Sequence, residues 1–313
     1  MDPDLIAHPA KASLQRLTDR LRGVPGGTAV TDFVQRAQDV GPLDDYKIFR
    51  QAARALIPTG QLEDGAPASQ VFLKAAILQG MIDTLASERF RSLPARVRAQ
   101  QLRQFQRMAA DTDENAEWLQ VDHDLFHKEF GIATLRLYVA GAQLADPRCG
   151  VPRSIVLKGG LKKLPGNLAA FIRLGGFRKY FQVHTHQFML DAFNEEGWNE
   201  CYLCCAELYA LHPEVLGMYG GSWFYDPALD EISPRLSYLR AIPTMGGAKL
   251  FFVEEGGSAR NNSLSASPTR RKLYEEGKYS PRSYMLVWGR SRQMAWADNF
   301  LKKFVLFANK ILQ

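Results

Sequence analysis

The sequence is poor in the features that mark several large classes of protein. It has four cysteines in 313 residues, too few and too unevenly placed for a disulfide framework, which favours a reducing compartment. The N-terminal sequence MDPDLIAHPAKAS has no apolar segment typical of a secretory signal. No run of about 18 apolar residues predicts a transmembrane helix. We therefore expect a cytoplasmic protein.

Several catalytic signatures are missing as well. The sequence contains no GxSxG elbow, no Walker A loop and no GxGxxG fingerprint. Their absence removes the best support for an ordinary hydrolase, an NTPase or a dinucleotide enzyme. Cys201, Cys204 and Cys205 give one CxxC-type spacing without a second pair. Because leucines surround them at helical spacing, we expect buried thiols rather than a zinc or redox site.

The chain has a net positive charge but no motif that identifies an anionic partner. The formal net charge is +6 and the isoelectric point is about 9.1. This balance permits phosphorylated ligands, anionic lipid or nucleic acid. The local excess of arginine over residues 89–107 comes without a zinc-finger, basic-zipper or RNA-recognition signature. We expect a small-molecule substrate and no sequence-specific nucleic-acid partner.

Hydrophobic periodicity divides the chain into two parts. Apolar residues recur at helical spacing through most of residues 13–110, including a helix at 44–57. After residue 131, short runs rich in β-branched and aromatic residues predict strands, among them 153–160 and 179–188. The expected fold class is α/β, in the α+β sense: a helical N-terminal region, residues 1–115, followed by a mixed-sheet domain, residues 116–313.

The densest series of signals lies between residues 213 and 289. It predicts strand, loop, helix, strand, helix and strand, in that order. Ser233-Pro234 and Ser267-Pro268 each combine a capping residue with a proline, which is a helix-start signal. The free N–H groups at such starts favour an anion. The predicted ligand-binding residues of this region are Ser222, Trp223, Ser233, Arg235 and Arg270.

The sequence RRKLYEEGKY, residues 270–279, follows the strand predicted at 249–254. With the order of the elements, it resembles the C-terminal half of the GNAT (Gcn5-related N-acetyltransferase) fold, in which a helix of the type LYEKxGF follows the fifth strand. The resemblance implies a GNAT-like mixed sheet, acyl-CoA or another acyl thioester as donor, and Tyr274 as the group that protonates the leaving thiolate. It covers a quarter to a third of the chain. The matching positions are Leu273, Tyr274, Glu275 and Gly277, with Tyr279 replacing the phenylalanine.

One part of the GNAT pattern is missing. The family's pyrophosphate loop has the form Q/R-x-x-G-x-G/A, whereas this chain has DEISPRLSYL at the corresponding place. Without those glycines the backbone cannot approach phosphates in the same way. Either the ligand is held differently or acyl-CoA is not the ligand.

Paired histidines suggest a second chemistry. His184 and His186 alternate along a predicted strand, so their side chains share a face. His123 and His127 are four residues apart on a predicted helix and also share a face. Imidazoles together with a carboxylate suit Zn, Fe or Mn. In the absence of a metal, either strand histidine is a candidate general base.

Three hypotheses follow from these observations. The favoured one is an acyltransferase-like enzyme that transfers an acyl group from a thioester to an amine or hydroxyl of a small molecule. Its catalytic residues would be Tyr274 as general acid, His184 or His186 as base, and Asp226 near the acceptor. The second is a metal-dependent enzyme that holds Fe or Zn through the paired histidines, and the third is a non-catalytic GNAT-like binding module. An amphipathic helix over 291–312 could contact a membrane surface or a second copy of the chain.

Overall fold

The computed structural model describes residues 3–24, 26–39, 67–265 and 267–311. The helix predicted at 44–57 lies outside these residues. The chain divides into two compact units. Unit 1 comprises Met1–Arg148 and Thr185–Asp191, and unit 2 comprises Cys149–His184 and Ala192–Gln313. The contacts thus extend the N-terminal unit beyond the purely helical region 1–115.

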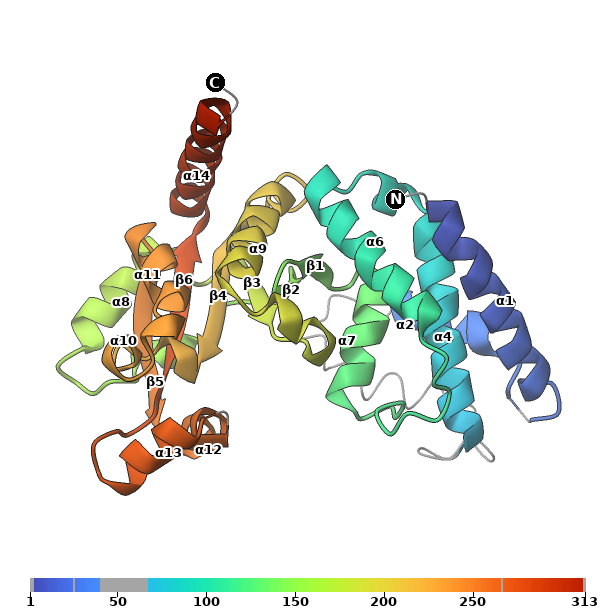
Figure 1. Cartoon of the computed structure of the whole chain (residues 1–313), viewed down its shortest axis with the longest axis horizontal. Coiled ribbons are helices and arrows are strands. Elements are labelled where there is room, and N and C mark those ends of the chain that lie inside the picture. The colour runs from blue at the N-terminus through green and yellow to red at the C-terminus, as the bar shows by residue number, and fades with distance from the viewer. Residues whose placement is uncertain (1–2, 25, 40–66, 266, 312–313) are drawn as a thin grey trace. The chain divides into compact units, whose positions relative to one another are not determined.

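Unit 1 is mainly helical, in agreement with the periodicity of its sequence (Figure 1). A buried hairpin, β1 (Tyr138–Ala140) and β2 (Gln143–Asp146), completes it. The helices are α1 (Pro3–Leu21), α2 (Val30–Asp39), α4 (Pro67–Ala86), α5 (Glu88–Arg91), α6 (Ala95–Ala110) and α7 (Asp124–Ala133).

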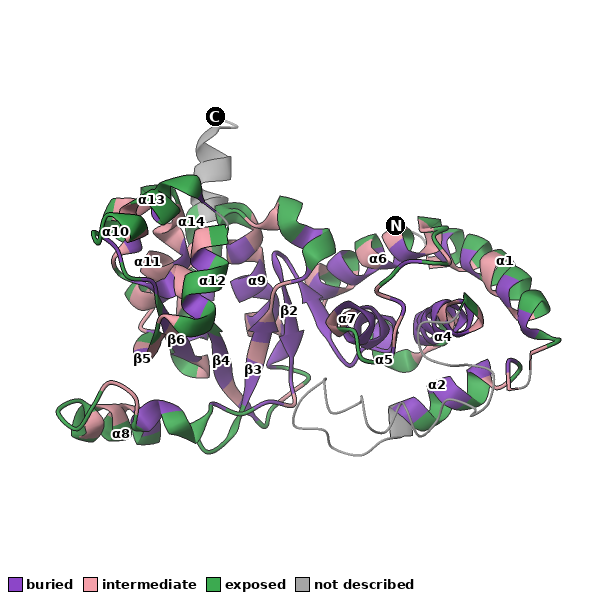
Figure 2. Ribbon diagram, turned by 90° about the horizontal axis from the view of Figure 1, so that it is seen from below, coloured by how far each residue is buried: buried purple, intermediate pink, exposed green. Residues whose placement is uncertain are grey.

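Helix α4 is the core helix of unit 1. It contacts α1, α2 and α7, and most of its length is buried (Figure 2). A helix that is apolar around its whole circumference is stable only when other elements enclose it. Phe72 of α4 packs edge-on against Phe33 of α2, with ring centroids 5.4 Å apart. This packing explains why the N-terminal helices form one unit.

Unit 2 combines a mixed sheet with helices and short 3₁₀ turns (Figure 1). Its strands are β3 (Lys179–His184), β4 (Val215–Ser222), β5 (Lys249–Glu255) and β6 (Arg282–Gly289). Its α-helices are α8 (Leu164–Arg173), α9 (Glu195–Leu208), α10 (Leu229–Ile232), α11 (Tyr238–Met245), α12 (Gly257–Ser265), α13 (Pro268–Glu275) and α14 (Arg290–Ile311). The 3₁₀ turns are η2 (Arg153–Val156), η4 (Trp223–Tyr225) and η5 (Pro234–Leu236), while η3 (Gln187–Ala192) ends in unit 2.

The strands of unit 2 lie in the order β3-β4-β6-β5. β3 and β4 are parallel and are joined through α9, whereas β6 is antiparallel to both β4 and β5. A parallel pair needs a long crossover, which α9 supplies. This mixture of helices and a mixed sheet confirms the expected α+β class.

Glycines allow close packing on both sides of Trp288. A Cβ atom at Gly217 would lie 2.2 Å from the Trp288 carbonyl oxygen and 2.4 Å from the Tyr180 ring. A Cβ atom at Gly246 would lie 2.2 Å from the Trp288 ring, whose Nε1 donates to the Gly246 carbonyl oxygen at 2.9 Å. A side chain at either position would clash, so only glycine fits at these two places in the core of unit 2.

The strand prediction for residues 153–160 is wrong. Residues 153–156 form η2, and the chain then turns through Gly159 and Gly160, both with positive φ. Ile155 and Val156 are buried all the same, because a single 3₁₀ turn can place two adjacent apolar side chains in a core. A short apolar run has no period by which a strand could be distinguished from such a turn.

The two Ser-Pro pairs predicted to start helices have different outcomes, and Asn194 starts a further helix of the second half. Asn194 caps α9 by accepting from Gly197 N, and Ser267 caps α13 by accepting from Arg270 N, as their sequences indicate. Ser233 forms no side-chain cap and precedes only η5. Within the described residues, no helix has an apolar stretch that would cross a bilayer.

Candidate functional site

The carboxyl end of β4 is the centre of the candidate site in unit 2. The strand ends at Ser222, whose Oγ accepts from Phe224 N at 3.5 Å and so starts η4 with Trp223. The parallel neighbour β3 ends at His184. Since parallel strands end at the same edge of a sheet, His184 and Ser222 share that edge. In open α/β sheets this is the edge where ligands bind.

Arg270 lies beside this edge and is almost completely buried, with 2% of its surface exposed. Its Nη1 donates to Ser233 Oγ at 3.1 Å, and its Nε donates to the carbonyl oxygen of Ser263 at 3.0 Å. Its guanidinium carbon is 4.5 Å from the centre of the Trp223 ring. The fold thus brings together three residues predicted to bind a ligand, Trp223, Ser233 and Arg270.

The charge of Arg270 is not neutralised within the described part of the chain. No carboxylate there lies within 4.0 Å of its guanidinium. Burial lowers the pKa of Arg270; Tyr279 acts in the opposite direction, and the positive charge of the exposed Arg235 lowers the pKa further. The site therefore has an excess of positive charge close to an aromatic ring.

Asp226 holds the loop of the site in place. Its Oδ1 accepts from Ala228 N at 3.1 Å and its Oδ2 accepts from Arg282 N at 3.2 Å. Burial raises the pKa of Asp226 and outweighs these two hydrogen bonds, which act in the opposite direction. Both oxygens accept from the main chain, so the carboxyl group joins the end of η4 to the start of β6.

Two tyrosines lie on or just after α13. Tyr274 is four residues beyond Arg270, so the two side chains share one side of the helix. Tyr274 is partly buried, and its hydroxyl has no hydrogen-bond partner in the described chain. The hydroxyl of the buried Tyr279 lies 3.2 Å from Ser263 Oγ, and burial raises its pKa. Of the two, Tyr274 has the hydroxyl that can exchange a proton with a ligand.

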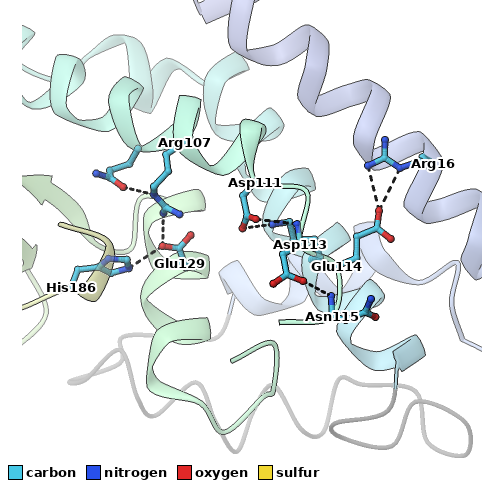
Figure 3. A network of polar contacts seen from close by, with 10 residues as sticks. Arg16, Arg107, Asp111, Asp113, Glu114, Asn115, Glu129 and His186 are labelled. Atoms are coloured by element: carbon cyan, nitrogen blue, oxygen red, sulfur yellow. Dashed lines mark hydrogen bonds and ion pairs between the residues drawn. The ribbon is translucent and has the colours of Figure 1, made fainter. Parts of the chain in front are cut away.

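His186 belongs to unit 1, where it forms part of a buried ionic cluster (Figure 3). Its Nε2 lies 2.9 Å from Glu129 Oε1, while its Nδ1 accepts from Phe188 N at 3.2 Å. Arg107 Nη2 binds the same Glu129 oxygen at 2.5 Å. Because Nδ1 is an acceptor, the proton of the neutral ring is on Nε2, the nitrogen that faces Glu129. Both nitrogens are therefore engaged, and neither is available to coordinate a metal.

The helix histidines have separate local roles. His123 is exposed and caps α7, since its Nδ1 accepts from Leu125 N at 3.1 Å. His127 is buried within α7. Among the described residues of unit 1, neither His123, His127 nor His186 belongs to a group of three side chains that could together bind a metal ion. His184, the remaining member of the predicted metal set, belongs to unit 2.

The cysteines are buried free thiols, as expected from their helical context. The hydrogen bond with Cys205 and burial raise the pKa of Cys201 well above its ordinary value. A thiol in this state is a poor nucleophile. The three cysteines of α9 are packed in the core of unit 2.

Sequence reasoning missed Ser263 and Tyr279 as members of the site. Ser263 accepts the Arg270 hydrogen bond through its main-chain oxygen. Every residue type has this oxygen, so the sequence does not indicate the contact. Tyr279 could have been found from its place in RRKLYEEGKY, two residues after Gly277, which ends the helix with a φ of 69°. Comparison with protein-family models, with curated proteins and with solved structures finds no match to this chain.

Proposed function

We propose that the protein is an acyltransferase-like enzyme that binds an anionic acyl thioester at the carboxyl end of β4 and acylates an amine or hydroxyl of a small molecule. The main support is Arg270, a buried guanidinium with no carboxylate of the described chain within 4.0 Å. An unpaired buried charge costs several kcal/mol, on the order of 3–5 kcal/mol when one partner is missing. A bound anion would supply that partner.

The surroundings of Arg270 suit an anion attached to an organic group. A guanidinium offers a planar fork of donors that matches carboxylate and phosphate oxygens. Trp223 covers one face of the guanidinium, and with Nη1 and Nε bonded to Ser233 and Ser263, Nη2 is the donor left for a ligand within the described chain. Arg235 adds a second positive charge near the first. This arrangement could replace the glycine loop that the sequence lacks.

The fold is also compatible with the resemblance to the GNAT family in RRKLYEEGKY. A mixed sheet with one parallel pair places His184 and Ser222 at the same edge. Tyr274 shares a helix side with Arg270, so it is the proposed proton donor. His184 is the proposed base because it is the strand histidine of unit 2.

In the proposed reaction, the acceptor nitrogen or oxygen bonds to the acyl carbon and the carbon–sulfur bond breaks. His184 takes the proton that the acceptor loses, and Tyr274 gives a proton to the departing sulfur. Solvent then returns the proton from His184 to Tyr274, which restores both groups. General acid–base assistance of this kind contributes roughly 10²–10⁴-fold to a rate.

Binding is tested by calorimetric titration of the full chain with acetyl-CoA and with decanoyl-CoA. We expect saturable binding of at least one thioester and at least tenfold weaker binding to Arg270→Gln. Arg271→Gln removes the same charge from an exposed neighbour on the same helix and should bind like the wild type. Trp223→Leu is a second variant that should weaken binding without removing a charge.

Two results would overturn the proposal. One is a lack of saturable binding of either thioester to correctly folded wild-type protein. The other is equal affinity of Arg270→Gln, Arg271→Gln and the wild type. Turnover is then measured as thiol release from acetyl-CoA with hydroxylamine as acceptor, and Tyr274→Phe should reduce the rate while leaving affinity unchanged. If the tightly binding wild-type protein is no faster than the uncatalysed reaction, the protein is a binding module.

A further inference from the structure

Unit 2 contains a recess far from the Arg270 site. It has a volume of about 840 Å³ and lies between α8, the starts of β4 and β5, and the start of α14. Leu216, near the start of β4, lines it, whereas Trp223 follows the other end of the same strand. Seven residues of extended chain correspond to about 23 Å. The two places are therefore separate.

The charged residues that line this recess are all basic. Four basic residues contribute to it and no acidic residue does: Arg173, Lys249, Arg290 and Arg292. In the described part of the chain, none of the four forms an ion pair within 4.0 Å of a carboxylate. Such a group of like charges in a recess destabilises the fold by repulsion and raises the local concentration of anions.

The recess is also lined by apolar side chains. Ala170 and Leu174 of α8, Leu216 of β4 and Met294 of α14 line it. Met294 is 40% exposed, although its own helix is docked on unit 2. A lining that combines cations with apolar side chains suits a ligand with an anionic end and an organic end. A recess of about this volume is in the range of small-molecule sites, roughly 300–1,000 Å³.

The start of α14 is held firmly at the recess. Gln293 is fully buried: its Nε2 donates to the Tyr202 carbonyl oxygen at 2.9 Å, and its Oε1 accepts from the Tyr209 hydroxyl at 2.6 Å. This anchor fixes the helix turn that carries Arg290 and Arg292, both of which precede Gln293 in sequence. A Cβ atom at Gly247 would lie 3.3 Å from Arg292 Cδ, so the bare backbone there leaves room for the Arg292 chain.

The first turn of α14 breaks the usual charge rule for helices. It contains Arg290 and Arg292 and no acidic residue, although the free N–H groups of a helix start favour negative charge. Local rules of this kind are most often broken at functional sites. A bound anion would satisfy both the helix start and the arginines.

We propose that this recess is a second binding site of the protein, for a phosphorylated small molecule with an apolar substituent. The four cations and the start of α14 bind the phosphate, and the apolar lining residues contact the substituent. A concave site formed by separate elements fits a small ligand better than the flat surface of a membrane. The site is independent of the acyl thioester proposed for the Arg270 site.

The probe is n-octyl phosphate below its micelle concentration, titrated calorimetrically into the full chain. We expect saturable binding that weakens as salt rises, with inorganic phosphate binding less tightly and octanol not at all. Arg173→Gln/Lys249→Gln should weaken octyl phosphate binding at least tenfold. Lys302→Gln/Lys303→Gln changes the same charge on exposed residues of α14 outside the recess and should leave affinity unchanged.

Two further variants separate the parts of the proposal. Met294→Ser should weaken octyl phosphate more than inorganic phosphate, because it removes apolar contact only. Arg270→Gln should leave octyl phosphate affinity unchanged. The proposal for the recess and the proposal for the Arg270 site can therefore be rejected independently of each other. Circular dichroism melts establish that each variant is folded.

Three outcomes would overturn the proposal. They are no saturable binding of octyl phosphate, unchanged affinity in Arg173→Gln/Lys249→Gln, and equal loss in the two double variants. A flotation assay with phosphatidic acid vesicles identifies the alternative source of the same phosphate chemistry. If the wild type floats, Arg173→Gln/Lys249→Gln does not, and free octyl phosphate does not bind, the recess is a membrane contact and the small-molecule proposal is wrong.

Discussion

His186 Nε2 lies 2.9 Å from Glu129 Oε1, at a place where both side chains are almost completely buried. Arg107 approaches the same oxygen from α6. The carboxylate oxygen thus has an imidazole nitrogen and a guanidinium nitrogen beside it (Figure 3). This arrangement keeps the segment Thr185–Asp191 within unit 1 and gives the cluster a defined response to pH.

Glu129→Gln should be strongly destabilising at pH 7. Burial alone would raise the pKa of Glu129, but the hydrogen bond of His186 and the charge of Arg107 outweigh it, and the pKa lies below the ordinary 4.5. The carboxylate therefore contributes stability above the unfolded-state pKa, and this contribution is lost as pH falls through the lower folded-state pKa. Loss of one partner of a buried pair costs about 3–5 kcal/mol.

Urea unfolding of wild type and Glu129→Gln at pH 7, 5 and 3.5 measures this effect. We expect the difference between the two unfolding free energies to be constant from pH 7 to 5 and to shrink at pH 3.5. Glu88→Gln, which affects an exposed ion pair with Arg91, should match the wild type throughout. A difference that grows toward acid pH would contradict the assigned direction of the pKa shift.

Gly246→Ala should destabilise unit 2. Its Cβ atom would come within 2.2 Å of the Trp288 ring, which is fully buried and cannot move away. Overpacking of this kind costs roughly 1–3 kcal/mol. The measurement is the urea concentration at the midpoint of unfolding, monitored by tryptophan fluorescence.

Gly166→Ala is the matched control for this substitution. Gly166 lies within α8, and an added Cβ atom there has nothing within 4 Å. Alanine is a better helix former than glycine by about 1 kcal/mol, so this variant should be at least as stable as the wild type. Equal behaviour of the two variants would contradict the close packing of Gly246 against Trp288.

Tyr209→Phe should loosen the attachment of α14. It removes the hydroxyl that donates to Gln293 Oε1 at 2.6 Å and leaves a buried acceptor without its partner. The expected loss of stability is about 1–3 kcal/mol. Tyr274→Phe removes a hydroxyl that has no hydrogen-bond partner in the described chain, and it should leave the melting temperature unchanged. Equal losses in both variants would rule out a specific role of the Tyr209 hydroxyl.

The four cysteines should be inert in the native protein. All are buried, and the pKa of Cys201 is raised by its hydrogen bond with Cys205 and by burial. With Ellman's reagent at pH 8, we expect almost no colour from folded protein and four equivalents in urea. One thiol that reacts within seconds in the native state would show that α9 carries a reactive cysteine.

Local signals in the sequence were sufficient for much of the fold. Asn194 and Ser267 identify helix starts because their side chains bond to N–H groups only three residues away. The strands at 215–222 and 282–289 are predictable because their apolar and β-branched residues act within one element. The strand predicted at 153–160 is wrong. Its buried residues lie in a short 3₁₀ turn, which has no periodic pattern in the sequence.

The sequence by itself determined the residue types of the candidate site, including the RRKLYEEGKY helix and the Ser-Pro pairs. Only the tertiary structure decided that Arg270 stacks on Trp223 and bonds to Ser233, because these contacts join residues 37 or more positions apart. It also assigned His186 to Glu129 rather than to a metal set with His184. The reason is physical: propensity and capping act over a few residues, whereas burial, charge and hydrogen-bond pairing depend on which distant segments the core brings together.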